Sequence, residues 1–411
     1  MLTKEFNNLI VVGQGYVGLP IAINAAKSGY KVFGFDINKV KIEQLKNGIS
    51  GSPEVEEDDL LRLQKVGKIE FTNTIPNLSE KSIFIIAVPT PLDANRKPDL
   101  TMLINACELI SKVLVDNSLI INESTSFIGT LRNLIQPAIQ SKSAAKNIKY
   151  AVAPERIDPG NTKWGIHNTP RIISGLDDAA TDLARDFYSQ FCDIVNIVSK
   201  PEVAEAAKLF ENTFRQVNIA LVNELSNIAE AFDFSTNETI LAASTKPFGF
   251  MPFFPSIGVG GHCIPVDPSY LAYSAESVGL KFKFIDLANE VNLKMPKITA
   301  MRIQSFLGGN LQNKRVQIAG ITYKPNIADL RESPALDLIA ELHNLGASIN
   351  WYDPYVPSYK NQVSTELDAD IDLGLIVTPH DQIDFSIWRK SGTKVLDLSA
   401  NSKDYGWPKF I

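Results

Sequence analysis

The stretch that decides the fold is "NLIVVGQGYVGLPIAINAAKSG", residues 8–29. Its first five residues have the composition of a short buried strand, "GQGYVG" is typical of a loop, and the remainder predicts a helix that ends at Gly29. Gly13, Gly15 and Gly18 form the pattern G-x-G-x-x-G between this strand and this helix. The first glycine permits a tight turn, the second lets a pyrophosphate approach the backbone, and the third allows close packing of helix on strand. The pattern therefore predicts a phosphate-binding turn at the N-terminus of a helix.

The next predicted strand, "KVFGFDIN", contains Asp36, which follows the glycine loop at about the spacing at which a carboxylate accepts hydrogen bonds from a ribose hydroxyl. The glycine pattern alone indicates only a turn, but the order strand, loop, helix, strand and aspartate predicts a dinucleotide site. Because a carboxylate would repel a ribose phosphate, we expect NAD rather than NADP.

Strands and helices continue to alternate through "SIFIIAV", "LTMLINACELISKVL", "SLIIN" and "IKYAV". This order predicts an α/β fold with a doubly wound parallel sheet. Small hydroxyl residues end two of the strands, in "AVPTP" (87–91) and "NEST" (122–125). The carboxyl ends of such strands form the ligand crevice, although ordinary turn chemistry accounts for the same residues. In "APERIDPG", Glu155 and Arg156 are either site residues or a surface ion pair.

Residues 203–232 contain no glycine or proline and predict one long helix. We expect it to be buried on all sides, because apolar residues also continue its more polar face. Lys208, Asn212 and Arg215 share one stripe of this helix, which is typical of either a solvated face or a cleft for a charged or hydroxylated ligand. The main apolar stripe consists of Val203, Phe210, Phe214, Val217, Leu221, Leu225 and Ile228.

Near Arg315 a second, smaller doubly wound pattern begins. We expect a dinucleotide-binding Rossmann domain at 1–198, a helical middle domain at 199–308 that joins the two sheets through the long helix, and a second Rossmann-like domain at 309–411.

Composition excludes several classes of protein. The formal charge of −6 and the lack of basic runs argue against nucleic-acid binding, and the apolar runs are too short to span a bilayer. The scattered histidines and the three cysteines have neither metal-ligand nor disulfide spacing, so we expect no metal site. Cys107 and Cys192 lie in apolar periodic stretches and are expected to be buried. A cytoplasmic enzyme or binding protein is the expectation.

Cys263 differs from the other two cysteines, because it lies in the irregular loop "GVGGHCIPVDPSYL", residues 258–271. We expect the preceding glycines to leave the sulfur unshielded and the backbone N–H groups accessible. A thiolate is the nucleophilic form of cysteine, and Asp267 is near enough in sequence to act on a proton or a water. We therefore interpret Cys263 as a nucleophile, the alternative being an inert buried thiol.

A nicotinamide cofactor and a nucleophilic thiol in one chain predict oxidation of an alcohol to an acid through a thiohemiacetal and a thioester. Two alternatives remain open at this point. One is a two-electron hydroxyacid dehydrogenase with Lys208 as acid and base, and the other is a non-catalytic NAD-binding regulatory protein.

Six ordered motifs across the chain resemble the UDP-glucose/GDP-mannose dehydrogenase family: "GQGYVGLP", "AVPTP", "APERIDPG", "EAAKLFENTFR", "GVGGHCIPVDP" and "YKPNIADLRESPA". The resemblance implies an NAD-dependent UDP-sugar 6-dehydrogenase of polysaccharide biosynthesis, with an N-terminal NAD domain, a middle domain that forms a homodimer through its central helices, and a C-terminal domain that holds UDP. It implies that Cys263 is the nucleophile, that Lys208 stabilises the oxyanion and relays protons, and that Asn212 supports the oxyanion. It also implies that Asp267 activates the water and that Glu155 assists thioester hydrolysis.

The resemblance further implies two sets of binding residues. The positions for the sugar nucleotide are Glu155, Arg156, Ile157, Lys208, Asn212, Arg215, Phe253, Ser256, Gly260, Tyr323 and Lys324. The positions for NAD are Gly13, Gly15, Tyr16, Val17, Gly18, Asp36, Lys41, Thr90, Thr125 and Arg331.

The segments "PERIDPGN" and "PFGFMPFFPSIGVGGHCIPVDP" are most similar to bacterial UDP-N-acetylglucosamine (UDP-GlcNAc) 6-dehydrogenases. UDP-glucose enzymes typically carry a PEF-type motif and an aromatic residue before the cysteine, where this chain has His262. UDP-N-acetylmannosamine (UDP-ManNAc) enzymes carry His-x-Arg where this chain has Pro247, Phe248 and Gly249. The resemblance thus favours UDP-GlcNAc and leaves its galactosamine epimer open.

Overall fold

The computed structural model describes residues 5–411 except 53, 159, 160, 162 and 262, so part of "APERIDPG" and His262 lie outside the described residues. The chain divides into two compact units, which are described one at a time. Unit 1 consists of Met1–Glu211 and Ser269–Gly279, and unit 2 consists of Asn212–Pro268 and Leu280–Ile411. The helices α7 (Pro201–Phe232) and α9 (Asp267–Glu276) contribute residues to both units.

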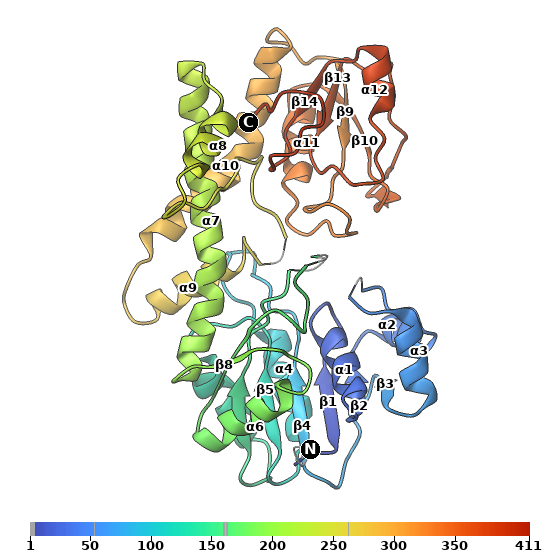
Figure 1. Ribbon diagram of the computed structural model, residues 1–411, viewed down its shortest axis with the longest axis vertical. Helices are drawn as coiled ribbons and strands as arrows, with labels where there is room; N and C mark the ends of the chain where they lie inside the picture. The colour runs from blue at the N-terminus through green and yellow to red at the C-terminus, as the bar shows by residue number, and fades with distance from the viewer. Residues whose placement is uncertain (1–4, 53, 159–160, 162, 262) are drawn as a thin grey trace. The chain divides into compact units, whose positions relative to one another are not determined.

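Unit 1 contains the predicted sheet (Figure 1). Its strands are β1 (Asn8–Val12), β2 (Lys31–Phe35), β3 (Ile69–Thr72), β4 (Ser82–Ile86), β5 (Leu119–Asn122), β6 (Lys149–Val152), β7 (Arg171–Gly175) and β8 (Val195–Ile197). Its helices are α1 (Gly18–Lys27), α2 (Lys39–Lys46), α3 (Glu57–Lys65), α4 (Thr101–Ser111), η1 (Leu131–Ile135), α5 (Gln136–Gln140) and α6 (Asp178–Tyr188).

The strands of this sheet follow the order β3-β2-β1-β4-β5-β6-β7-β8. The first six reproduce the strand order of a dinucleotide-binding sheet, in which strands are added on one side of β1 and then on the other. Such sheets bind ligands at the carboxyl ends of the two strands where the order changes, here β1 and β4. The pair β6–β7 is antiparallel, so the predicted all-parallel arrangement fails there.

Both faces of the sheet are covered, as predicted. Along β1, Leu9 and Val11 belong to one apolar cluster, while Ile10 and Val12 belong to another. Because successive strand residues point to opposite faces, the two clusters lie on opposite sides of the sheet. The first cluster includes apolar residues of α1, α2, α3 and α6, and the second includes those of α4, η1 and α5. Cys107 and Cys192 are buried in these clusters, which confirms the prediction for both thiols.

The prediction that α7 is buried on all sides is wrong. Val203, Phe210, Phe214, Leu221 and Ile228 are each more than 40% exposed in the single chain. The sequence pattern identified a continuous apolar face correctly, but the part of the chain that the structure describes leaves this face partly exposed.

Unit 2 contains the predicted smaller sheet, with four parallel strands in the order β10-β9-β13-β14. Its first strand, β9, lies between the second strand, β10, and the third, β13. The strand order of this sheet therefore also changes side at β9. The elements of unit 2 are α8 (Thr236–Ser244), α10 (Lys283–Phe306), β9 (Arg315–Ala319), α11 (Pro334–Asn344), β10 (Ser348–Tyr352), β11 (Ser358–Tyr359), β12 (Gln362–Val363), β13 (Leu373–Ile376), α12 (Ser386–Ser391) and β14 (Val395–Asp397). Among the described helices, none has the length and apolar character needed to cross a membrane.

Candidate active site

The glycine loop has the geometry that a dinucleotide site requires. Gly13 has φ +98°, and a Cβ atom there would lie 2.3 Å from the carbonyl oxygen of Ala87. A Cβ atom on Gly18 would lie 1.9 Å from the carbonyl oxygen of Gly13, so this glycine is required for the packing of α1 on β1. A Cβ atom on Gly15 would meet no atom within 4 Å. The space in front of Gly15 is therefore open, as the approach of a pyrophosphate demands.

Asp36 follows β2 and closes the other side of this loop. Its carboxylate accepts hydrogen bonds from the backbone N–H groups of Gln14 at 2.9 Å and Asn38 at 2.9 Å. Tyr16 and Val17 complete the loop, and Val17 is the N-cap residue of α1. Lys41 lies in the first turn of α2. Burial lowers the pKa of its ammonium group, while the charge of Asp36 acts in the opposite direction.

Thr90 and Thr125 join the ends of β4 and β5. The Thr90 side chain is 1% exposed, and its hydroxyl donates to the carbonyl of Thr125 at 2.8 Å. The hydroxyl of Tyr270 donates to the carbonyl of Thr90 at 3.1 Å. The hydroxyl of Thr90 therefore fixes the shape of this edge, and Thr125 is the more exposed of the two residues.

Glu155, at the end of β6, belongs to a buried charge network. The Arg171 guanidinium donates to Glu155 at 2.8 Å and to Glu123 at 2.9 Å, and the hydroxyl of Tyr188 donates to Glu123. The second oxygen of Glu155 accepts the backbone N–H groups of Arg156 and Ile157, both at 2.6 Å. Three N–H groups thus hold the Glu155 carboxylate in one orientation.

The two carboxylates of this network differ in their tendency to ionise. Burial raises the pKa of Glu123 to about 8, with repulsion by Glu155 adding to the effect and Arg171 opposing it. Burial also acts against ionisation of Glu155, but Arg171, the Ile157 N–H group and Lys208 outweigh it, so the pKa of Glu155 is lowered. One guanidinium shared by two buried carboxyl groups therefore favours a charged Glu155 and a protonated Glu123.

Glu155 and Arg156 do not form the ion pair with each other that the sequence left open. The Arg156 guanidinium instead pairs with Glu211 at 2.6 Å and donates to the carbonyl of Pro170 at 2.7 Å. Ile157 packs against the apolar cluster under the sheet. The backbone after Glu155 is therefore fixed on both sides, although 159, 160 and 162 lie outside the described residues.

Cys263 lies in unit 2 in a turn that leads into α9, and its side chain is exposed. Its carbonyl accepts the N–H groups of Val266 at 3.2 Å and Asp267 at 2.9 Å. This turn leads directly into the first turn of α9. The exposed side chain shows that Cys263 is not a buried thiol.

The sulfur of Cys263 is exposed, as expected, but the N–H group of Gly261 is hydrogen-bonded, and the glycines before Cys263 also permit close packing. Gly261 has φ +85°, and a Cβ atom there would lie 2.6 Å from the ring of Tyr323. A Cβ atom on Gly260 would lie 2.8 Å from the Cβ atom of Tyr323 and 2.8 Å from the carbonyl oxygen of Glu332. The N–H group of Gly261 donates to the carbonyl of Arg331 at 3.0 Å. The glycines therefore let residues 258–266, which we call the nucleophile loop after the role predicted for Cys263, pack against the 323–332 segment.

Asn212 and Asp267 meet directly. The side-chain amide of Asn212 donates to the Asp267 carboxylate at 2.5 Å, and Asp267 is 1% exposed. Lys208 and Arg215 occupy the same stripe of α7 as Asn212, one turn before and about one turn after it. Lys208 is mostly buried and Arg215 is exposed.

The remaining predicted sugar-nucleotide and cofactor residues of unit 2 lie in loops. The ring of Phe253 packs edge-on against Phe214 with centroids 5.7 Å apart. Ser256 is buried and donates to the carbonyl of Gly258 at 2.7 Å. Arg331, just before α11, pairs with Asp329, and its side chain is 49% exposed. Tyr323 and Lys324 follow β9 and are partly buried.

In each unit, sequence reasoning missed residues that hold the predicted site residues of that unit. Arg171, Glu123 and Tyr188 hold Glu155, and His380 with Asp353 holds the loop that carries Tyr323. Glu123 lies in "NEST" and His380 lies in "VTPH", and each of these segments ends a strand. A polar residue at the end of a strand was the signal that could have identified both. Arg171 opens a strand and carries no such signal.

Family models match almost the whole chain. They describe the UDP-glucose/GDP-mannose dehydrogenase family: its NAD binding domain matches residues 7–192, its central domain 202–294 and its UDP binding domain 317–399.

Individual relatives agree with these matches. Protein CapL of Staphylococcus aureus is 36% identical over 405 residues, which cover 97% of this chain and 92% of that protein. The UDP-GlcNAc 6-dehydrogenase of Pseudomonas aeruginosa is 35% identical over 84% of this chain and 82% of that protein. The structure of the UDP-ManNAc dehydrogenase of Pyrococcus horikoshii matches with a TM-score of 0.85 and 31% identity over 97% of both chains. The chain belongs to the UDP-glucose/GDP-mannose dehydrogenase family and is an NAD-dependent UDP-sugar dehydrogenase.

Proposed function

We propose that the enzyme oxidises the 6-hydroxymethyl group of a UDP-N-acetylhexosamine, preferentially UDP-GlcNAc, to the carboxylate. The observation that carries this proposal is the exposed thiol of Cys263 in a turn that ends at Asp267, whose buried carboxylate accepts a hydrogen bond from Asn212. A dehydrogenase that stops at the aldehyde has no use for such a thiol, whereas a covalent thioester needs one.

The Gly13–Gly18 loop and Asp36 would hold NAD, which would supply the two-electron acceptor for each of two oxidations at carbon 6. The thiolate of Cys263 adds to the aldehyde carbon, and the new C–S bond gives a thiohemiacetal. Loss of two further electrons gives a thioester, and water then cleaves the C–S bond to release the carboxylate and the thiolate. Per sugar nucleotide, two NAD⁺ and one water are consumed, and two NADH and three protons are formed.

The side chains around the thiol have separate roles in this scheme. Lys208 stabilises the oxyanion and relays protons, and Asn212 supports the same oxygen. Asp267 accepts a proton from the attacking water, and its hydrogen bond to Asn212 orients it. Glu155 assists thioester hydrolysis, and three N–H groups hold its carboxylate in one orientation.

Binding of the two nucleotides follows the residue sets that the family resemblance implies. For NAD, the open space at Gly15 and the carboxylate of Asp36 support the pyrophosphate and ribose positions. For the UDP-sugar, Tyr323 and Lys324 follow the first strand of the second sheet, at the edge where such sheets bind ligands. The other members of this proposed set are Glu155, Arg156, Ile157, Lys208, Asn212, Arg215, Phe253, Ser256 and Gly260.

A second substrate, UDP-ManNAc, is favoured by the relative from Pyrococcus horikoshii. The segment Pro247–Gly249 lacks the His-x-Arg of such enzymes and favours UDP-GlcNAc instead. Initial rates with UDP-glucose and with the gluco, galacto and manno UDP-N-acetylhexosamines test the choice. We expect UDP-GlcNAc to give the highest kcat/KM, and a higher value for any other sugar overturns this part of the proposal. In every case Cys263→Ser should abolish steady turnover, since a serine hemiacetal is a poor substitute for the thiol adduct.

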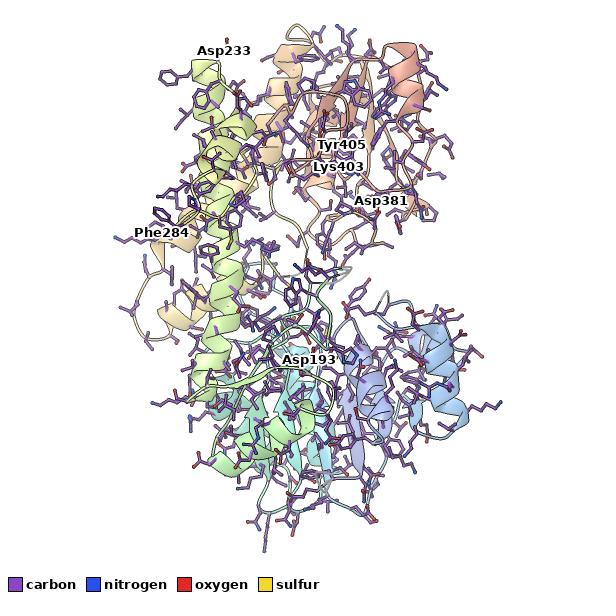
Figure 2. The ribbon with its side chains drawn as sticks, in the orientation of Figure 1. Asp193, Asp233, Phe284, Asp381, Lys403 and Tyr405 are labelled. Carbon is purple, nitrogen blue, oxygen red and sulfur yellow. The ribbon has the colours of Figure 1, made fainter. Side chains whose placement is uncertain are left out.

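We also propose that the enzyme is a homodimer that pairs through its central helices. On unit 2, Phe214, Leu221 and Ile228 of α7 are exposed, and so are Phe284 and Leu287 of α10. The side chain of Phe284 projects outward in Figure 2. An apolar face of this kind marks an association surface. Leu221→Asp should give a monomer in analytical ultracentrifugation, whereas Glu224→Gln on the same helix should not.

The three family models support a division into an NAD domain at 1–198, a middle domain at 199–308 and a UDP-sugar domain at 309–411. A cytoplasmic role in polysaccharide biosynthesis completes the proposal, because uronate sugar nucleotides are precursors for glycosyl transfer.

A further inference from the structure

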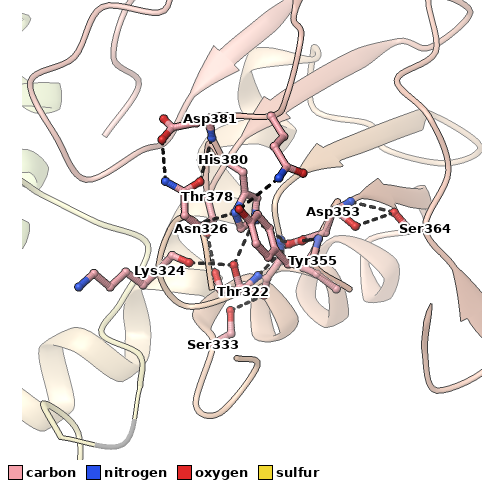
Figure 3. A network of polar contacts seen from close by, with 12 residues as sticks. Thr322, Lys324, Asn326, Ser333, Asp353, Tyr355, Ser364, Thr378, His380 and Asp381 are labelled. Carbon is pink, nitrogen blue, oxygen red and sulfur yellow. Dashed lines mark hydrogen bonds and ion pairs between the residues drawn. The ribbon is translucent and has the colours of Figure 1, made fainter. Parts of the chain in front are cut away.

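Three strand ends of the second sheet meet in a buried polar cluster (Figure 3). Thr322 follows β9, Asp353 follows β10 and His380 follows β13. These are the carboxyl ends of three adjacent parallel strands, at the point where the strand order changes side. In Figure 3 the side chains of His380 and Asp353 point toward each other, while the side chain of Lys324 extends away from both.

The contacts of His380 define its tautomer. The backbone N–H of Asn326 donates to Nδ1 at 2.8 Å, so Nδ1 carries no proton. Nε2 therefore carries the proton, and it faces the Asp353 carboxylate at 3.0 Å and the Thr322 hydroxyl oxygen at 3.2 Å. The hydroxyl proton of Thr322 is directed to the carbonyl of Lys324 at 3.0 Å. His380 and Asp353 are both almost fully buried, so each of these contacts lies away from water.

Asp353 fixes the start of the same loop. Its carboxylate accepts the N–H groups of Ile321 at 2.8 Å, Thr322 at 3.2 Å and Tyr355 at 2.9 Å. The pKa of Asp353 is lowered, because His380 and these N–H groups outweigh the effect of burial. Asp353 thus holds the second and third residues after β9, and His380 holds the loop at Asn326, whose left-handed backbone has φ +63°.

The loop held at both ends carries Tyr323 and Lys324. The ring of Tyr323 packs where a side chain on Gly261 would otherwise lie, and Gly261 precedes Cys263 by two residues. A fixed chain of contacts therefore runs from His380 and Asp353 through the 321–326 loop to the glycines of the nucleophile loop.

We propose that His380 and Asp353 are positioning residues that hold the 321–326 loop in the conformation that binds the uridine diphosphate of the substrate and supports the nucleophile loop. This inference rests on the proposed function, because that function assigns Tyr323 and Lys324 to the sugar nucleotide. Neither His380 nor Asp353 needs to touch the substrate itself.

Substitutions of His380 separate its two contacts. In His380→Asn the amide oxygen takes the place of Nδ1 and still accepts the Asn326 N–H, while in His380→Ala that acceptor is lost. His380→Gln keeps a donor for Asp353 but not the acceptor for Asn326. The exposed His343, on α11 of the same unit, provides the control His343→Asn.

The experiment measures binding of UDP and of NAD by calorimetry, together with the melting temperature and kcat. We expect His380→Ala to weaken UDP binding about tenfold or more, which is the size of a lost buried hydrogen bond. His380→Asn should stay within about threefold of wild type. The affinity for NAD should be unchanged in these variants. His343→Asn should bind UDP and NAD as the wild type does. If His380→Ala does not fold, the UDP affinities of His380→Asn and His380→Gln test the inference instead. We expect His380→Gln to bind UDP more weakly than His380→Asn.

The outcomes separate this inference from the proposed function. If wild type does not bind UDP, the proposed function fails. If wild type binds UDP and His380→Ala binds it equally well, the positioning role fails while the proposed function stands. Equal loss of UDP binding, NAD binding and melting temperature in His380→Ala, His380→Asn and His380→Gln would mean a purely structural role and would overturn the inference.

Discussion

Asn212 donates a hydrogen bond of 2.5 Å to the carboxylate of Asp267, although 55 residues separate them in the sequence. Asn212 lies in α7, and Asp267 is the first residue of α9, four residues after Cys263. The contact ties the polar stripe of the long helix to the end of the nucleophile loop. It brings together two of the residues that the family resemblance assigns to catalysis.

Asp267→Asn should reduce kcat by about a hundredfold or more, the range expected when a positioned proton acceptor is lost. Asn212→Ala should reduce it less, since the carboxylate remains but loses one donor. Initial rates of NADH formation measure both. Asn218→Ala is the control, because Asn218 lies on the same helix and bonds only locally to the carbonyl of Phe214 among the contacts described here. Asp267→Asn with more than half of the wild-type rate would exclude the proposed role.

Gly15→Ala and Gly18→Ala should fail in different ways. The added methyl group of Gly15→Ala enters open space, so the melting temperature should stay the same while KM for NAD rises about tenfold. Gly18→Ala places its methyl group against the carbonyl of Gly13 and should lower the melting temperature. Thermal melts and NAD titrations measure the two effects. Unchanged NAD binding in Gly15→Ala would mean that the pyrophosphate lies elsewhere.

Gly261→Ala tests the packing of the nucleophile loop against Tyr323. Both Gly261 and Gly279 have positive φ, but only at Gly261 would a methyl group meet another side chain. Each substitution should cost about 1–2 kcal/mol of backbone strain. Gly261→Ala should in addition lower kcat/KM about tenfold, a loss on the order of that from a misplaced catalytic group. Similar kcat/KM values for the two variants would show that this packing has no catalytic consequence.

Glu123→Gln should change how stability depends on pH. In the folded chain Glu123 keeps its proton up to about pH 8, against a pKa of 4.5 without its surroundings. The folded state therefore binds more protons between these values, and the free energy of unfolding falls as pH rises through this window. Glutamine does not ionise, so Glu123→Gln should show a smaller fall in melting temperature across the window.

The comparison with wild type isolates Glu123. Burial raises the pKa of Glu205 to about 7, so this residue also lowers the free energy of unfolding as pH rises. Its effect is present in both the wild type and Glu123→Gln. Glu43→Gln on the exposed α2 serves as the control and should follow wild type. Parallel melting curves for Glu123→Gln and wild type would contradict the assignment of a proton to Glu123.

The amino-acid sequence was sufficient to predict much of this structure. Gly13, Gly15, Gly18 and Asp36 predicted the first sheet and its loop, because a strand, turn and helix of this kind have one common arrangement. The apolar stripe of α7 was also predicted, but periodicity reports only that a face is apolar. It does not distinguish a face buried in the chain from one left for a partner, so the prediction of full burial was wrong.

The remaining features depend on contacts between distant segments. Arg171 joins Glu123 and Glu155 from a third strand, and an arginine at a strand start is usually exposed. His380 lies far from Asn326 and Asp353 in sequence, and a scattered histidine carries no sign of its partners. Such networks become visible only when the strand order is known.

In the proposed reaction, Cys263 carries the substrate from aldehyde to acid. The most direct measurement is the number of NADH molecules formed per UDP-GlcNAc when the sugar nucleotide is limiting and NAD is in excess, with the product identified by mass spectrometry. We expect two NADH and a carboxylate product from the wild type, and no steady turnover in Cys263→Ser. One NADH per sugar with an aldehyde product, or full turnover in Cys263→Ser, would contradict the proposed reaction.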